Sequence, residues 1–156
     1  HIARANELAR LPPGGTSALA IFQGPDAYVT PSWYETKRET GKVVPTWNYA
    51  VVHAHGTLRP IDDPDWLRRQ IGELTDRHEG QRRERWHVED APDEFIRAQI
   101  KGIVGLELEV TKLEAKWKLS QNRPASDRAG VVAGLREDEG PASPMAAMVE
   151  RGGSNA

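Results

Sequence analysis

Cysteine is missing from the chain of 156 residues. This absence excludes disulfide bonds, thiolate metal ligands and a cysteine nucleophile, and it is in keeping with a reducing compartment, so we expect a cytoplasmic protein. Long apolar runs are also missing. No segment is long enough to cross a bilayer, and no basic segment followed by an apolar leader opens the chain. We therefore expect no membrane partner.

A marked excess of charge of either sign is missing too, because 21 Lys and Arg residues stand against 23 Asp and Glu residues, for a net charge of −2. A domain that binds DNA through its own surface usually carries a basic excess, so the charge does not support DNA as a partner except through a local patch. The candidate patch is Arg82, Arg83 and Arg85 in GQRRERW. The alternative interpretation is a solvated loop with acidic neighbours.

Recognisable catalytic motifs are absent as well. The sequence contains no Ser-His-Asp order, no phosphate-binding glycine loop and no metalloprotease helix motif, so the catalytic residues stay unknown. His53 and His55 in PTWNYAVVHAHG (45–56) would share one face of a strand and could begin a metal site. Zinc needs three or four protein ligands, however, and no further ligand stands in register. We predict no metal site and interpret the two histidines as packing or dimer-interface residues.

Segments rich in β-prone or alternating residues dominate the first part of the chain. Strands are predicted at 18–23, 27–34, 45–61 and 103–114. The first two flank the turn signal Gly24-Pro25-Asp26 and should form a hairpin, followed by an exposed polar loop at 35–42.

Three further segments have helical patterns, at 62–80, at about 90–102 and at 124–135. In the first, Asp63 can cap the helix and an apolar stripe ends at His78. In the second, Ile96, Ile100 and Phe95 should face inward.

The order of these elements predicts the fold class. No helix separates the early strands, so parallel crossovers do not fit there, and the sheet should be antiparallel. We predict a mainly β fold with packed helices, its sheet curled into a barrel. One domain should cover 1–136, and its abrupt entry at HIARANELAR leads us to expect missing N-terminal strands. Residues 137–156, rich in Gly, Pro, Ser and charge, should form a disordered tail.

Two short stretches have residues suited to an anionic ligand. In HIARANELAR, Arg4 and Asn6 stand where a β-prone entry meets a helical run, so free backbone N–H groups and an arginine could bind an anion. The alternative is a capped helix with a surface arginine. In KWKLSQNRP (116–124), Trp, amide and cationic side chains suit a planar anionic ligand, while the alternative is a polar strand end.

Three blocks of the sequence resemble the PaiB family of FMN-binding negative transcriptional regulators, known from bacteria. They are FQGPDAYVTPSWY, GKVVPTWNYAVVHAHG and KWKLSQNRPASDRAGVVAGL, they occur in the family's order, and the resemblance covers about residues 1–136. It implies a split β-barrel like that of pyridoxamine-phosphate-oxidase-type flavoproteins, FMN as the cofactor, and a homodimer with flavin at the subunit interface.

The resemblance also implies roles for particular residues. Arg4 and Asn6 would hold the FMN phosphate, and Asn48 and Trp47 would offer side chains to the flavin ring. Further contacts with FMN would come from Lys118, Gln121 and Arg123, either of the same subunit or of the other subunit of the dimer. Because Trp47 and Asn48 are neighbours on a strand, they point to opposite faces, and we favour Asn48 as the ring contact.

The implied function is negative transcriptional regulation or flavin-linked sensing. The alternative is a flavin-dependent oxidoreductase, an FMN reductase or oxidase, in which the cofactor supplies the chemistry. A DNA-binding repressor with a vestigial barrel is the third hypothesis, against which the charge and the lack of a helix-turn-helix count.

Overall fold

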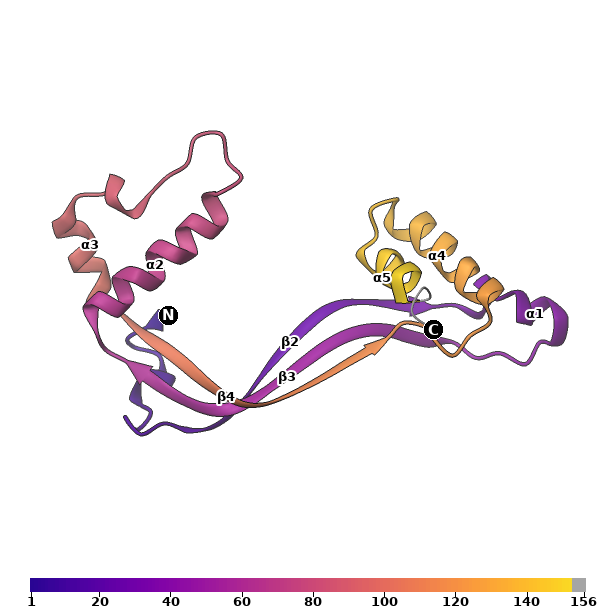
Figure 1. Cartoon of the computed structure of the whole chain (residues 1–156), viewed down its shortest axis with the longest axis horizontal. Coiled ribbons are helices and arrows are strands. Elements are labelled where there is room, and N and C mark those ends of the chain that lie inside the picture. Colours follow the sequence, from indigo (N-terminus) through magenta and orange to yellow (C-terminus); the bar gives the residue numbers. More distant parts are fainter. Residues whose placement is uncertain (153–156) are drawn as a thin grey trace. The chain divides into compact units, whose positions relative to one another are not determined.

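The computed structural model describes residues 1–152, and the chain divides into two compact units (Figure 1). The first unit combines His1–Leu19 with His55–Lys112, and the second combines Ala20–Ala54 with the chain from Leu113 onward. Three long strands, β2 (Thr16–Val29), β3 (Thr46–Ile61) and β4 (Ile103–Lys118), each contribute one stretch to each unit. The single domain that we predicted is therefore built as two units.

The strands form a four-stranded sheet in the order β1-β4-β3-β2, where β1 (Ile2–Ala3) pairs antiparallel with β4. The prediction of a mainly antiparallel sheet with packed helices is confirmed. Within residues 1–152, however, β1 and β2 lie at opposite ends of this order, so the sheet is open and not closed into a barrel. None of the helices in this range combines the length and apolar character needed to cross a membrane.

Strand β2 runs without interruption through Gly24-Pro25-Asp26, so the predicted hairpin is wrong. β2 is the last strand in the sheet order, and Pro25 is tolerated there because an edge strand needs no N–H on its open side. Gly24 lies against β3, where an added Cβ would be 3.1 Å from the Cβ of Ala50. The apparent turn signal thus marks an edge position and a close approach of two strands.

Helices α2 (Pro64–Glu79) and α3 (Asp93–Ile100) belong to the first unit, which confirms the helices predicted there. The Asp63 carboxylate accepts the backbone N–H groups of Asp65, at 2.9 Å, and of Trp66, as an N-cap does. Leu67, Ile96 and Ile100 are buried together with Val88 in one core. Phe95 is 56% exposed, so its predicted inward orientation is wrong.

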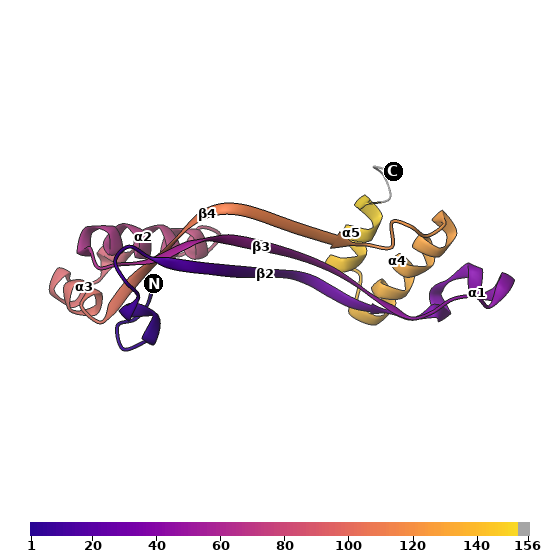
Figure 2. The same cartoon turned by 90° about the horizontal axis from the view of Figure 1, so that it is seen from below.

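Helices α1 (Glu35–Thr40), α4 (Ala125–Glu139) and α5 (Pro144–Gly152) belong to the second unit, where α4 and α5 pack side by side (Figures 1 and 2). The predicted polar loop at 35–42 is wrong, because α1 occupies most of it. Gly41 caps the end of this helix, and its φ of 67° suits glycine.

The predicted disordered tail is also wrong for residues 137–152. Helix α4 continues to Glu139, and α5 buries Met145, Ala146 and Val149 in a core with Val29, Tyr34, Leu119, Val131 and Leu135. The apolar residues of α5 are spaced to share one helical face, although Gly, Pro and charged residues around them dominate the local composition. Residues 153–156, the rest of the predicted tail, lie outside the described residues.

Trp33 packs on a face of α4 that carries glycines. A Cβ added at Gly134 would overlap the indole ring of Trp33, and a Cβ at Gly130 would overlap the Trp33 carbonyl oxygen. We expect Gly134→Ala to destabilise the protein by about 1–3 kcal/mol, because the ring and the helix must move apart. Gly72→Ala in α2 is the matched control, since nothing lies within 4 Å of its added Cβ and helix propensity should give a gain of about 1 kcal/mol. Denaturant unfolding measures both, and equal effects of the two changes would contradict the packing.

Candidate functional site

A polar pocket of about 200 Å³ lies in the second unit, where β3 begins and β4 ends. Apart from Val44, its lining side chains carry a charged, amide or hydroxyl group: Tyr34, Val44, Thr46, Asn48, Lys118, Ser120, Asn122 and Arg123. Two segments far apart in the sequence, VPTWN and KLSQNR, therefore supply most of it. The structure thus brings Asn48, Lys118 and Arg123, three of the residues predicted from the sequence, into one pocket.

Asn48, one of the lining residues, is fully buried. Its Nδ2 donates to Ser120 Oγ at 3.0 Å, and the Ser120 hydroxyl donates back to Asn48 Oδ1 at 3.2 Å. Ser120 has a φ of 59°, in the left-handed region that residues other than glycine rarely adopt. The buried pair therefore holds the chain in a strained turn directly after β4.

Lys118 and Arg123 supply two positive charges. Lys118 Nζ donates to Thr46 Oγ1 across the two strands. The Arg123 guanidinium carbon lies 4.5 Å from the ring centroid of Tyr34, a cation–π arrangement. The Arg123 backbone N–H also donates to the Ser120 carbonyl at 3.0 Å, so the strained turn sets the position of this arginine.

Tyr34 is only 1% exposed, and its hydroxyl has no hydrogen-bond partner among the described residues. Burial raises the pKa of Tyr34, and the nearby positive charge of Arg123 opposes this rise. The hydroxyl therefore remains a neutral, buried donor at physiological pH.

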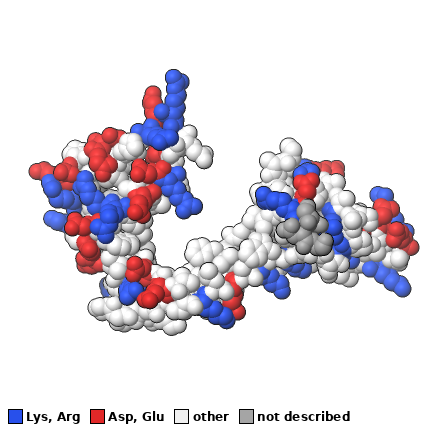
Figure 3. Space-filling view, viewed as in Figure 1, with Lys and Arg blue, Asp and Glu red and all other residues white. Residues whose placement is uncertain are grey.

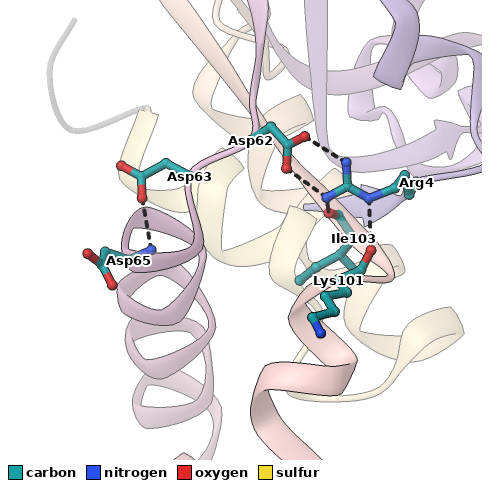
Figure 4. Close-up of polar contacts among 6 residues, drawn as sticks. All are labelled: Arg4, Asp62, Asp63, Asp65, Lys101 and Ile103. Atoms are coloured by element: carbon teal, nitrogen blue, oxygen red, sulfur yellow. Dashed lines mark hydrogen bonds and ion pairs between the residues drawn. The ribbon is translucent and has the colours of Figure 1, made fainter.

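Arg4 and Asn6 belong to the first unit, where both are engaged by the protein. Figure 4 shows the contacts of Arg4. The Arg4 guanidinium donates two hydrogen bonds of 2.7 Å to the Asp62 carboxylate and further ones to the carbonyls of Lys101 and Ile103. Asn6 caps a short 3-10 helix, Glu7–Arg10, by accepting the Leu8 N–H. Their phosphate role stays a prediction, and an anion at Arg4 would have to compete with Asp62.

Trp47 and Gln121 do not line the pocket. Trp47 is 52% exposed, and its ring meets that of Tyr28 edge-on at 5.8 Å. Gln121 is used locally, since its side chain accepts the Leu119 N–H and donates to the Trp117 carbonyl. The predicted opposition of Trp47 and Asn48 across the strand is confirmed, whereas contact of either residue with flavin stays a prediction.

Sequence reasoning missed Tyr34 and Thr46 as members of the pocket. Tyr34 stands in a block quoted for the resemblance, but nothing local marks it as a ligand-facing residue. No group of three or more His, Cys, Asp or Glu residues that could hold a metal occurs within residues 1–152, and His53 and His55 are part of no such group.

Comparison with known proteins supplies the family. A family model described as "Putative FMN-binding domain" matches residues 1–112 of the chain. The chain belongs to this family. It is also 32% identical over 151 residues to the Protease synthase and sporulation protein PAI 2 of Bacillus subtilis, covering 96% of the chain and 70% of that protein. FMN is therefore the cofactor of this domain.

Relatives also occur in fungi. An uncharacterised protein of Aspergillus fumigatus is 38% identical over 135 residues, covering 76% of the chain and 52% of that protein. One of Emericella nidulans is 41% identical over 128 residues, covering 75% of the chain and 51% of that protein. The chain thus spans about half the length of these two fungal relatives.

The residues of the pocket fit part of an FMN molecule. Two cations, a buried amide and an unpartnered hydroxyl match the polar groups of the cofactor. The pocket is smaller than the roughly 300–1,000 Å³ of a typical small-molecule site, so it fits one end of the cofactor and not the whole. Asn48, Lys118 and Arg123 are the residues that would bind and orient that end, while flavin supplies the redox chemistry when bound.

The Arg4–Asp62 pair predicts a pH-dependent contribution to stability. Its hydrogen bond with Arg4, and then the charge of Arg4, lower the pKa of Asp62 below its usual 3.8. The pair therefore stabilises the fold above about pH 4, and this contribution is lost as the pH falls through the lowered pKa. We expect Asp62→Asn to lower the Tm slightly at pH 7, because both groups are exposed to solvent, and the difference from the native chain to close toward pH 3.

Thermal unfolding between pH 7 and pH 3 measures this difference. Asp26→Asn is the control, because Asp26 forms no ion pair within residues 1–152 and should change little at any pH. A difference for Asp62→Asn that stays constant over the whole range would show that the ion pair is not its cause.

Proposed function

We propose that this chain is the FMN-binding part of a homodimeric cytoplasmic protein that acts as a negative transcriptional regulator or flavin-linked sensor. The observation that carries the proposal is the polar pocket of the second unit, which gathers cations, an amide and an unpartnered hydroxyl in a chain of an FMN-binding family. The regulatory role is supported by the resemblance to the PaiB family and by the name of the Bacillus relative, which refers to protease synthesis and sporulation.

The open sheet supports the split-barrel and dimer parts of the proposal. In the second unit, buried Ala27, Val29, Asn48 and Ala50 alternate along β2 and β3 with Tyr28, Trp47 and Tyr49, which therefore share the opposite face. On β4, Lys118 faces the pocket, so alternation puts Leu113 and Trp117 on that same opposite face. Tyr28, Trp47, Leu113 and Trp117 are 47–65% exposed. We call this set the aromatic face.

An aromatic face of this kind favours burial in an interface. Large exposed apolar patches mark interaction sites, and Trp and Tyr are enriched at the centres of such interfaces. In Figure 3, charged side chains gather over the helices, and the surface over the strands is mostly uncharged. A second copy of the chain covering the aromatic face would remove these side chains from water and bring two sheets together, as in a dimeric split barrel.

The cofactor contacts follow from the same arrangement. Asn48, Lys118 and Arg123 would hold one end of FMN, and the exposed Trp47 and the loop of Gln121 would contact it only if the partner or a local rearrangement brought them near. Arg4 and Asn6 would hold phosphate only by competing with the contacts that engage them now.

Flavin binding can be tested by titrating the full chain with FMN and following flavin fluorescence. We expect uptake of FMN by the native chain and about tenfold weaker binding by Lys118→Met, because one charge-assisted contact is removed. Lys116→Met is the matched control on the same strand, since Lys116 is exposed and does not line the pocket.

Absence of any FMN uptake would overturn the flavin part of the proposal. If FMN is bound, addition of NADH or NADPH separates the two functions: an unchanged flavin spectrum supports a sensor or regulator, and rapid bleaching supports the oxidoreductase alternative.

The dimer can be tested by replacing Leu113, which is 65% exposed on the aromatic face. We expect Leu113→Glu to convert a dimer into a monomer in analytical ultracentrifugation, because a carboxylate cannot be buried there without a partner. Leu74→Glu in α2 is the control for an exposed leucine elsewhere and should leave the dimer intact. A monomeric native chain, or a Leu113→Glu chain that stays dimeric, would contradict the proposed interface.

A further inference from the structure

The pocket of the second unit contains more donors than its own residues satisfy. Lys118 Nζ has the Thr46 hydroxyl as its hydrogen-bond acceptor, and the Arg123 guanidinium lies over a ring face. Within residues 1–152 neither cation forms an ion pair, and the Tyr34 hydroxyl has no partner. A buried donor without an acceptor costs free energy, so the arrangement is incomplete without a further group.

We propose that this pocket is an oxyanion site, which receives one phosphate or carboxylate group of a small ligand through Lys118, Arg123 and the hydroxyl of Tyr34. The inference deepens the proposed function, because the phosphate of FMN is one source of such a group. A small carboxylate ligand is the other source. The shared chemistry is an anion with several oxygen acceptors.

The charges around the pocket support an anion and not a cation. The acidic group whose charge acts on Tyr34 is Asp127, which is fully buried and contributes to the raised pKa of Tyr34. Its two carboxylate oxygens are already bound by the backbone N–H and the hydroxyl of Thr36, at 2.9 and 3.0 Å. Asp127 therefore does not line the pocket, and the two cations dominate its charge.

The size of the pocket supports a single group. About 200 Å³ is too little for a complete flavin or substrate but leaves room for a phosphate or carboxylate and the atoms next to it. The bidentate geometry of a guanidinium and the point charge of an ammonium are the usual pair of donors for such groups.

The strained turn at Ser120 gives the site its shape. Left-handed backbone at a residue other than glycine persists only where surrounding contacts hold it, and such strain collects at ligand sites. Here Asn48 holds the Ser120 side chain, and the Arg123 N–H holds the Ser120 carbonyl. The turn thus places Arg123 over Tyr34 before any ligand arrives, so less ordering is needed on binding.

The site can be tested with inorganic phosphate as the probe. We expect phosphate to raise the Tm of the full chain above its value in chloride of equal ionic strength. Tyr34→Phe, which removes only the hydroxyl, and Arg123→Met should each weaken phosphate binding about tenfold by calorimetry. Arg123→Lys should recover part of the loss because it restores the charge. Lys116→Met is the matched control and should bind phosphate like the native chain.

A purely structural polar cluster makes the opposite prediction. In that case phosphate and chloride would give the same Tm, or Tyr34→Phe and Arg123→Met would respond to phosphate like the native chain, and either outcome overturns the oxyanion site. If Arg123→Met fails to fold, Tyr34→Phe still decides, because it keeps the size and shape of the ring.

Comparison of FMN with riboflavin, which lacks the phosphate, distinguishes the two sources. If the site receives the FMN phosphate, Arg123→Met weakens FMN but not riboflavin, and free phosphate competes with FMN. If the site serves a carboxylate ligand, Arg123→Met loses the response to phosphate and acetate while both flavins bind unchanged. A chain that responds to phosphate but takes up no flavin would retain the oxyanion site and reject the proposed flavin function.

Discussion

The buried hydrogen-bonded pair of Asn48 and Ser120 is the interaction on which the candidate site depends. An amide buried without partners would cost about 1–3 kcal/mol, and Ser120 satisfies both its donor and its acceptor. The pair joins Asn48, near the start of β3, to Ser120, which follows the core residue Leu119 just after the end of β4. It thereby holds the left-handed turn from which Arg123 reaches Tyr34. The position of Arg123 in the pocket therefore follows from this contact.

Local signals in the sequence were sufficient where local physics decides the outcome. The cap at Asp63, the helix that follows it and the full length of the strand to Ile61 could be predicted because capping and alternation act over a few residues. The opposite orientation of Trp47 and Asn48 followed from the same alternation.

The predictions failed where a distant partner overrides the local pattern. Gly24-Pro25-Asp26 has the residues of a turn, but pairing with β3 keeps this segment extended at the sheet edge. Composition alone made residues 137–156 look disordered, yet Met145 and Val149 are buried in a core with Val29 and Tyr34, which stand far earlier in the sequence. Neither partner can be read from the segment itself, because both contacts join positions that are not adjacent in the sequence.

The candidate site could be predicted only in part, again because local sequence signals do not reveal contacts between distant segments. The density of cations and amides in KWKLSQNR pointed to Lys118 and Arg123, and the resemblance added Asn48. Tyr34 and Thr46 could not be predicted, because their places depend on how the segment before β3 folds against the end of β4. Gln121 has a side chain suited to bind a ligand, but its amide oxygen accepts the backbone N–H of Leu119 within its own turn. Arg4 likewise looks free in the sequence, and its acidic partner lies far along the chain.

The division of three strands between two units has a consequence for how this protein can be dissected. The family match ends at Lys112, where the first unit also ends, so this position would seem a natural place to cut the gene. A fragment ending there would keep Asn48 but lose Ser120, together with α4 and α5 that cover Val29 and Tyr34. Residues 20–54 would then expose an apolar core face to water, so truncation at the family boundary should yield an aggregating product and not a minimal flavoprotein.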